Sequence, residues 1–295
     1  MVFVVGATGL VGSEICRRIS KRGEKVRALV RATSSTEKIE MLRSCGAELR
    51  VGDLKDLDSI SALCQGVDAV ISTASSTLSR QEGDSIESVD SAGQMNLVHA
   101  AKAAGVKRFV FVSFRQSPGL SFPLDDAKRN VEKAIASMDF TIIQASWFME
   151  VWLSPVLGFD YANQTARIYG PGTVPVSWVS YQDVAEICTL ALRNPAAGHK
   201  TIEFGGPTAI SPLEVVARFE EIGGRPFNLE HVPETTLRAQ FEQATDSMQK
   251  SFAALLLGLS HGDAINMASI VEQFGIKLTS VDEYARRVLG KLAVA

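Results

Sequence analysis

Short apolar runs alternate with amphipathic stretches along the first half of the chain. The apolar runs are rich in β-branched residues and predict strands at VFVV (2–5), KVRALV (25–30), AELRV (47–51), VDAVIST (67–73), RFVFVS (108–113) and FTII (140–143). Between them, apolar residues recur every three or four positions, as Leu10, Ile15 and Ile19 do, and this spacing predicts helices. Apolar strands separated by helices predict a doubly wound α/β fold, in which helices cover both faces of a parallel sheet.

The longest helical pattern in this half spans residues 86–104. Its apolar and small positions are Ile86, Val89, Gly93, Leu97, Ala100 and Ala104. Gly23, Gly66 and Gly105 follow three of the amphipathic stretches, and glycine commonly ends a helix. We therefore expect one continuous helix over 86–104.

The regular alternation loosens after Ala145. An aromatic and apolar segment, WFMEVWLSPVLGF, precedes the turn-rich YGPGTVPVS. Helices are then expected at QDVAEICTLAL, where Asp183 favours the N-terminus, and at 212–222, 234–258 and 281–293, with a strand at TIEFGG. We predict a sheet domain at 1–145 and a smaller C-terminal α/β lobe at 146–295. We expect the lobe to pack over the carboxyl ends of the strands, with parts of 176–204 returning to the main sheet.

Composition and charge exclude several classes of protein. Hydrophobic residues make up 46% of the chain and charged residues 21%, as in ordinary soluble globular proteins. The net charge of −3 provides no basic field for nucleic acid or anionic membranes, so neither partner is expected. No apolar run reaches the roughly 18 residues of a membrane span, and nothing that resembles a signal peptide precedes the first strand, so we expect a cytoplasmic protein.

The cysteines and histidines show no ligand spacing. The chain has four of each, without close pairs, which predicts neither a disulfide framework nor a metal site. Cys16, Cys64 and Cys188 lie among apolar residues, so we expect buried and inert thiols there.

Three glycines follow the first predicted strand. Gly6, Gly9 and Gly12 form G-x-x-G-x-x-G between that strand and the first helix, a spacing that differs from the common G-x-G-x-x-G. In such a turn the first glycine permits the tight bend, the second lets backbone N–H groups approach a pyrophosphate, and the third lets the helix pack close to the strand. Because the helix N-terminus also favours phosphate, the loop predicts a bound dinucleotide.

The end of the second strand suggests which dinucleotide binds. An NAD-binding turn usually places a carboxylate there, whereas this chain has Arg31 followed by Thr33, Ser34 and Ser35. An arginine and hydroxyl groups suit a 2′-phosphate, so NADP (NADPH) is predicted and NAD is less favoured. The alternative is a solvated surface arginine.

Several motifs together resemble a known family. GATGLVG, LVR, GDLKDLDSI, AAKAAGVKRFVFVS, VEKAI…FTII and VSYQDVAEI resemble, in this order, the NmrA-like branch of the atypical short-chain dehydrogenase/reductases. The resemblance covers about residues 1–225, and residues 226–295 match nothing that we can place. It implies a Rossmann fold that binds NADP(H). Some members of the family reduce quinones, enones or dyes, whereas others sense the NADP/NADPH balance without turnover.

The resemblance also implies roles for individual residues. Asp53 and Leu54 would flank the adenine, Ser113 takes the place of the family's serine, and Lys128 would hold the nicotinamide ribose and act in catalysis together with Ser113. The implied cofactor-binding residues are Gly6, Thr8, Gly9, Leu10, Val11, Gly12, Arg31, Asp53, Leu54, Thr73, Ala74, Ser75 and Lys128. Taken alone, Asp53 could equally serve a turn, and Lys128 could be a solvated helix lysine.

One position departs from the wider superfamily. Its catalytic tyrosine stands four residues before the lysine, where this chain has Leu124, and the nearest tyrosine is Tyr161. Without that phenol, reduction of an isolated ketone lacks a positioned acid, which typically contributes about 10²–10⁴-fold. A quinone, an enone or a cationic dye needs no strong acid, because its product spreads the charge and Lys128 or water can complete proton transfer.

The aromatic segment after the sixth strand is the candidate substrate region. Trp147, Phe148, Met149 and Trp152 could form the wall of a flat pocket, or they could fill a core between two lobes. Two functions therefore remain open at this point. The chain is either an NADPH-dependent reductase of a small conjugated molecule, or a non-catalytic NADP(H)-binding sensor or assembly protein with a protein partner.

Overall fold

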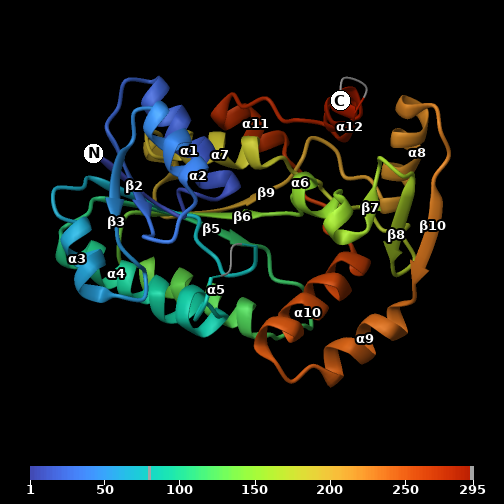
Figure 1. Ribbon diagram of the computed structural model, residues 1–295, viewed down its shortest axis with the longest axis horizontal. Coiled ribbons are helices and arrows are strands. Elements are labelled where there is room, and N and C mark those ends of the chain that lie inside the picture. Colours follow the sequence, from blue (N-terminus) through green and yellow to red (C-terminus); the bar gives the residue numbers. More distant parts are fainter. Residues whose placement is uncertain (79–80, 293–295) are drawn as a thin grey trace. The chain divides into compact units, whose positions relative to one another are not determined.

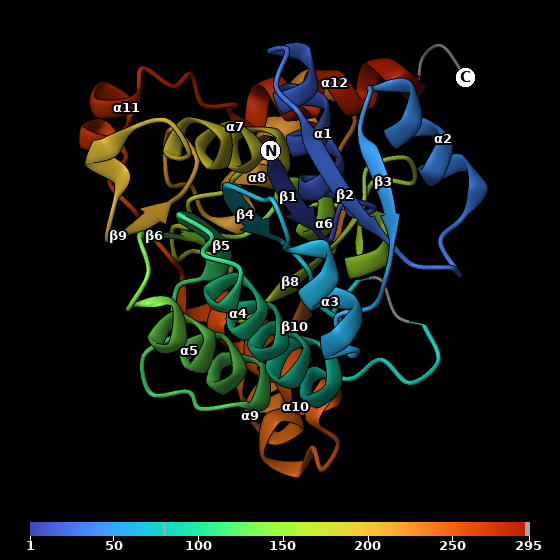
Figure 2. The same cartoon turned by 90° about the vertical axis from the view of Figure 1, so that its left-hand side faces the viewer.

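A seven-stranded sheet forms the centre of the first of two compact units in the computed structural model, which describes residues 1–78 and 81–292. The strand order is β3-β2-β1-β4-β5-β6-β9 (Figures 1 and 2). The strands are β1 (Val2–Val5), β2 (Val26–Val30), β3 (Glu48–Val51), β4 (Ala69–Ser72), β5 (Arg108–Phe114), β6 (Phe140–Ala145) and β9 (Lys200–Phe204). The order 3-2-1-4-5-6 is that of a Rossmann fold, so the predicted doubly wound α/β architecture is confirmed.

Parallel pairing brings the loops that follow the strands to one edge of the sheet. β1 pairs in parallel with both β2 and β4, and Val5 lies opposite Ser72 at the carboxyl ends. The Thr73 N–H donates to the carbonyl oxygen of Val5 at 2.9 Å. The loops after β1 and β4 therefore leave the sheet side by side, at the switch point where doubly wound folds bind ligands.

Helices cover both faces of this sheet. They are α1 (Leu10–Lys21), α2 (Thr36–Ser44), α3 (Leu57–Leu63), α4 (Gln94–Ala103), α5 (Pro123–Ile135) and α7 (Tyr181–Ala191), with a short 3₁₀ turn η3 (Pro195–Ala197). Figures 1 and 2 show α1 and α7 on one face and α3, α4 and α5 on the other. Arg22, the C-cap residue of α1, forms an ion pair with Glu186 on α7 at 2.7 Å, and apolar side chains fill the interior between helices and sheet.

The helix expected over 86–104 begins differently from the prediction. Residues Ile86–Gly93 form a π-helix, η1, and α4 starts only at Gln94. Ser85 caps η1, because its hydroxyl accepts the Ser88 N–H while Ser88 bonds back to the Ser85 N–H. A three- or four-residue apolar spacing does not distinguish a π-turn from an α-turn, and π-turns are often found at functional sites.

The chain divides between the two units at several places. The first unit contains Met1–Phe114, Pro123–Gln144 and Val184–Ile202, and the second contains Arg115–Phe122, Ala145–Asp183 and the chain from Glu203 onward. The strand expected at TIEFGG is β9 of the main sheet.

The second unit has its own small sheet and core. Its strands have the order β10-β8-β7, with β7 (Phe159–Asp160) antiparallel and β10 (Asn228–Val232) parallel to β8 (Thr165–Tyr169). The helical elements are α6 (Met149–Trp152), η2 (Pro155–Leu157), α8 (Pro212–Gly223), α9 (Glu234–Gln243), α10 (Ser247–His261), α11 (Ala268–Phe274) and α12 (Val281–Leu292).

The prediction of one helix over 234–258 is wrong, because two helices, α9 and α10, occupy this stretch. The break lies before Asp246, whose carboxylate accepts the N–H groups of Met248 and Gln249 at 3.0 and 2.9 Å and so begins a new helix.

Candidate cofactor site

The glycines between β1 and α1 face different steric demands. Gly6 has a φ of +83°, which residues with a side chain rarely adopt. A Cβ on Gly12 would lie 2.2 Å from the carbonyl oxygen of Gly6 and would push α1 away from β1. Among the described residues, a Cβ on Gly9 would meet only that same oxygen, at 3.3 Å. The conformation and close packing of the loop therefore require glycine at positions 6 and 12. At Gly9 the space beside the loop is open to a ligand.

The first turn of α1 presents free backbone donors. The N–H of Gly9, the N-cap residue, is already bonded to the Gly6 carbonyl at 3.0 Å. The N–H groups of Leu10, Val11 and Gly12 have no acceptor within the part of the chain that the structure describes. The turn also lacks acidic side chains, so the partial positive charge of the helix end is not neutralised. These donors fit the oxygens of a dinucleotide's pyrophosphate.

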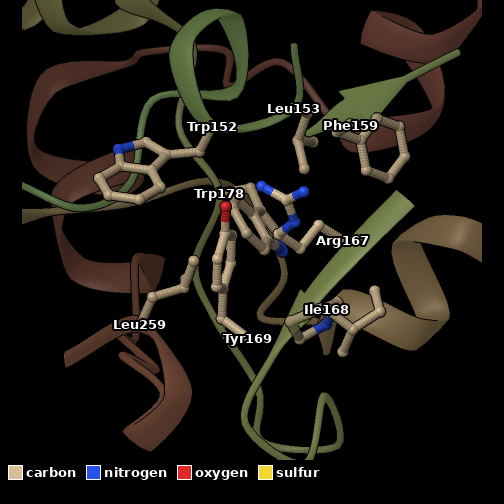
Figure 3. Close-up of a pocket in the computed structure, with 9 residues that line it drawn as sticks. Trp152, Leu153, Phe159, Arg167, Ile168, Tyr169, Trp178 and Leu259 are labelled. Atoms are coloured by element: carbon tan, nitrogen blue, oxygen red, sulfur yellow. The ribbon is translucent and has the colours of Figure 1, made fainter. Parts of the chain in front are cut away.

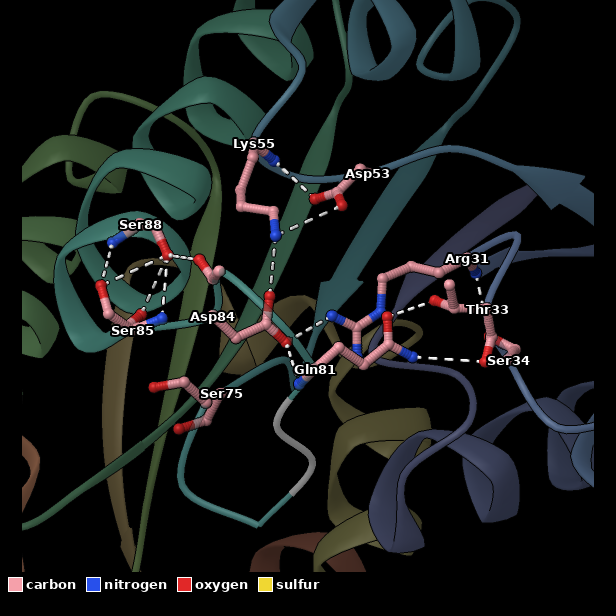
Figure 4. Close-up of polar contacts among 12 residues, drawn as sticks. Arg31, Thr33, Ser34, Asp53, Lys55, Ser75, Gln81, Asp84, Ser85 and Ser88 are labelled. Atoms are coloured by element: carbon pink, nitrogen blue, oxygen red, sulfur yellow. Dashed lines mark hydrogen bonds and ion pairs between the residues drawn. The ribbon is translucent and has the colours of Figure 1, made fainter.

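Arg31, at the end of β2, has an acidic partner. Its Nη1 donates to Oδ2 of Asp84 at 2.5 Å, and Nζ of Lys55 donates to Oδ1 of the same carboxylate at 2.9 Å (Figure 4). Burial opposes the ionisation of Asp84, but hydrogen bonds from Arg31, Lys55 and the Gln81 N–H together lower its pKa. Arg31 is therefore not a freely solvated arginine, and the hydroxyl of Ser34 accepts its backbone N–H.

The predicted adenine-side residues have structural partners. Asp53 accepts the backbone N–H of Lys55 at 2.9 Å, which is the turn role considered as its alternative. The side chain of Leu54 is buried and packs in the core of the first unit.

The loop after β4 lies against the glycine loop. The hydroxyl of Thr73 donates to the Val5 carbonyl at 3.2 Å, and the Ala74 carbonyl accepts Nε2 of Gln94 at 2.8 Å. The structure thus brings Thr73, Ala74 and Ser75 to the same edge of the sheet as the glycines, where Thr8 is also half-buried.

Lys128, on α5, is buried beside a carboxylate. Its Nζ lies 3.6 Å from Oδ1 of Asp90, on η1, and 4.9 Å from the centre of the Phe111 ring. The other oxygen of Asp90 accepts the N–H and the hydroxyl of Ser76 at 2.9 and 2.6 Å. Burial lowers the pKa of the Lys128 ammonium, although Asp90 acts in the opposite direction. Lys128 is therefore a buried amine with a weakened hold on its proton, and not a solvated helix lysine.

Ser113 and Leu124 are also buried. The hydroxyl of Ser113, on β5, accepts a hydrogen bond from Nη2 of Arg129 at 3.0 Å. Leu124 is only 2% exposed, so an apolar side chain fills the position at which the sequence analysis looked for a tyrosine. Tyr161 belongs to the second unit.

The predicted substrate residues belong to the second unit. Met149 is fully buried in that unit's core, which favours the packing interpretation for this residue. The rings of Trp147 and Trp152 meet edge to face, with centroids 4.6 Å apart. Trp152 also lines a pocket of about 20 Å³ together with side chains from β7, β8 and α10 (Figure 3). That volume is enough for about one water molecule, so this pocket does not hold a ring system.

Burial also determines the state of the cysteines. It raises the pKa of the Cys16 and Cys188 thiols far above neutrality and that of Cys64 to about 11. Within residues 1–78 and 81–292, no group of three or more His, Cys, Asp or Glu side chains could hold a metal ion.

None of the helices in the described ranges combines the length and the apolarity that crossing a bilayer would require.

The structure adds residues that the sequence reasoning missed. Asp90 is an acidic residue next to an apolar helical stripe, and that conflict could have marked it for attention. Lys55 lies inside the quoted motif GDLKDLDSI. Asp84 gave no signal, because 53 positions separate it from Arg31 and only the fold brings them together.

Curated proteins are similar to most or nearly all of the chain. The curated photosystem II assembly factor Ycf39 of Synechocystis is 30% identical over 304 residues, covering 99% of this chain and 91% of that protein. An NAD(P)H azoreductase of Xenophilus azovorans is 28% identical over 232 residues, covering 77% of this chain and 75% of its own length.

A solved structure shares the fold. It is an NADPH-dependent quinone oxidoreductase of Escherichia coli in complex with NADPH, with a TM-score of 0.79 and 20% identity, covering 98% of this chain and 99% of that one. The sequence model of the NmrA-like family matches residues 1–285. The chain belongs to the NmrA-like family.

Proposed function

We propose that this protein binds NADP(H) at the loop after β1 and transfers hydride from NADPH to a flat, conjugated small molecule such as a quinone, an enone or a cationic dye. The observation that carries the proposal is the open first turn of α1, with its three free N–H groups beside a glycine loop. The activities named for the azoreductase relative and for the quinone oxidoreductase that shares the fold support this type of reaction.

Lys128 would hold and release the proton of the reaction. The bound nicotinamide supplies the hydride. Because burial lowers the pKa of the Lys128 ammonium, Nζ can give up a proton more readily than an exposed lysine, and Asp90 holds the amine in place. The hydroxyl of Ser113 accepts from Arg129, which leaves its own proton free to donate to the acceptor's oxygen or nitrogen.

Leu124 limits the range of substrates. A buried leucine cannot protonate an alkoxide, so an acceptor whose reduced form already spreads its charge is favoured. We assign the wall of the acceptor site to Trp147, Phe148 and Trp152, and we give Met149 a packing role because it is fully buried.

NADPH is the proposed cofactor in preference to NADH. Arg31 provides the charge for a 2′-phosphate, with Thr33 and Ser34 beside it. We also propose, from the sequence alone, that the protein is cytoplasmic.

The test is NADPH oxidation against a panel of quinones, enones, azo dyes and cationic dyes. The wild type is compared with Lys128→Ala and with Lys133→Ala, which changes an exposed lysine on the same helix. Acceptor-dependent oxidation that falls at least tenfold in Lys128→Ala and is unchanged in Lys133→Ala is expected. If the wild type binds NADPH but none of the acceptors in the panel leads to its oxidation, the reductase proposal is wrong.

That negative result would favour the second candidate, a non-catalytic NADP(H)-binding assembly or sensor protein. Two observations support it: Leu124 in place of the tyrosine, and the relative named as a photosystem II assembly factor. A pull-down with NADP⁺-loaded and nucleotide-free protein would then show whether a protein partner depends on the nucleotide.

A further inference from the structure

Two cations converge on one buried carboxylate at the carboxyl edge of the sheet. Arg31 comes from the end of β2, Lys55 from the loop after β3, and Asp84 from the segment before η1 (Figure 4). The side chain of Asp84 is 1% exposed, whereas those of Arg31 and Lys55 are 23% and 30% exposed. Both oxygens of Asp84 accept hydrogen bonds from these cations, and the carboxylate itself is shielded from solvent.

The formal charges of this cluster cancel. Besides Asp84, the carboxylate of Asp53 lies 3.7 Å from Nζ of Lys55. Two positive and two negative side chains thus meet at one place, with no net charge to offer a doubly charged phosphate. Without Asp84, the same place would carry a net positive charge, and both cations would be available to one anion.

The position of this cluster is that predicted for the 2′-phosphate of the cofactor. Because a phosphate must share Arg31 and Lys55 with Asp84, it gains less from them than it would gain from free cations, and it is repelled by the carboxylate beneath. An unphosphorylated ribose is not affected by this competition. The cluster therefore weakens NADPH binding selectively.

We propose that Asp84 is a specificity-determining residue, which occupies Arg31 and Lys55 and thereby reduces the preference of this chain for NADPH over NADH. Lys55 is accordingly a second cation of the 2′-phosphate site. The inference rests on the proposed binding of NADP(H).

The experiment measures dissociation constants of NADPH and NADH by titration calorimetry for the wild type and Asp84→Asn. Asparagine keeps the shape and one acceptor oxygen but removes the charge. NADPH affinity is expected to rise about tenfold, the scale of one charge-assisted hydrogen bond, while NADH affinity changes less than about twofold. Glu82→Gln is the matched control, since it removes the same charge from an exposed residue of the same segment and should alter neither constant.

Lys55→Met keeps the inference testable if Asp84→Asn does not fold. It should weaken NADPH several-fold and leave NADH unchanged, whereas Lys25→Met, at an exposed lysine before β2, should change neither. An unchanged or lower NADPH-to-NADH preference in folded Asp84→Asn would overturn the inference, because Asp84 would then only position the cations. The inference would also be overturned if Lys55→Met bound NADPH as tightly as the wild type does. If the wild type binds neither dinucleotide, the proposed function itself fails, and this result is distinct from the others.

Discussion

Alanine substitutions at Gly9 and Gly12 should separate the folding of the glycine loop from its binding function. At Gly12, the added Cβ would lie 2.2 Å from the carbonyl oxygen of Gly6 and 2.9 Å from Cα of Ala7. Both are backbone atoms, so relief requires α1 to move by about 1 Å relative to β1. Overpacking of this kind costs about 1–3 kcal/mol, and the helix propensity of alanine returns at most about 1 kcal/mol. We expect Gly12→Ala to lose about 2 kcal/mol of the free energy of unfolding.

Gly9→Ala should behave differently. Its Cβ has one close neighbour, at 3.3 Å, and the φ of −85° suits alanine. The poorer N-cap costs about 0.5 kcal/mol, and the stiffer unfolded chain returns a similar amount, so stability should stay within about 0.5 kcal/mol of the wild type. The methyl group enters the open side of the loop, where a pyrophosphate would approach, so NADPH affinity should fall at least tenfold.

Urea unfolding and NADPH titration of both variants provide the measurement. Gly290→Ala serves as the control, because a Cβ there meets nothing in the described structure and should stabilise α12 slightly. The reasoning is refuted if Gly9→Ala destabilises the protein as much as Gly12→Ala, or if Gly9→Ala binds NADPH like the wild type.

Three further predictions concern the charged side chains. Arg31→Ala should weaken NADPH binding by about 1.5 kcal/mol and leave NADH binding unchanged. This value is at the lower end for a hydrogen bond to a charged group, because Asp84 already engages Arg31. Equal weakening of NADPH and NADH binding would contradict the assignment. Lys128→Met should lower the free energy of unfolding, measured in urea, by about 3 kcal/mol, because it leaves Asp90 buried without its cation. Adding Asp90→Asn to the same chain should recover most of this loss. No recovery would show that the two side chains are not coupled. The pKa of Asp84 is lowered in the folded state, so its contribution to stability is complete above about pH 4 and is lost as the pH falls through the folded pKa. The wild type should therefore lose more of its Tm between about pH 4 and pH 2 than Asp84→Asn, and parallel curves would refute this contribution.

The second half of the chain was less predictable than the first. The apolar runs of the Rossmann sheet are buried, so their pattern alone indicates strands, as at β1 and β5. β10 has largely exposed residues and therefore no apolar pattern to reveal it. The break between α9 and α10 depends on Asp246, which caps the N-terminus of α10. The apolar repeat continues through this break and therefore suggests a single helix.

The doubly wound sheet, the glycine loop and the family can be recognised from the amino-acid sequence, because these depend on local spacing and on the order of motifs along the chain. The electrostatic partners of the candidate site become visible only in the folded chain. Lys128 meets Asp90 because η1 packs against α5, and Arg31 meets Asp84 because the segment before η1 runs past the end of β2. An ion pair depends on the distance between its charges and on their burial. For residues this far apart in the chain, the sequence pattern indicates neither.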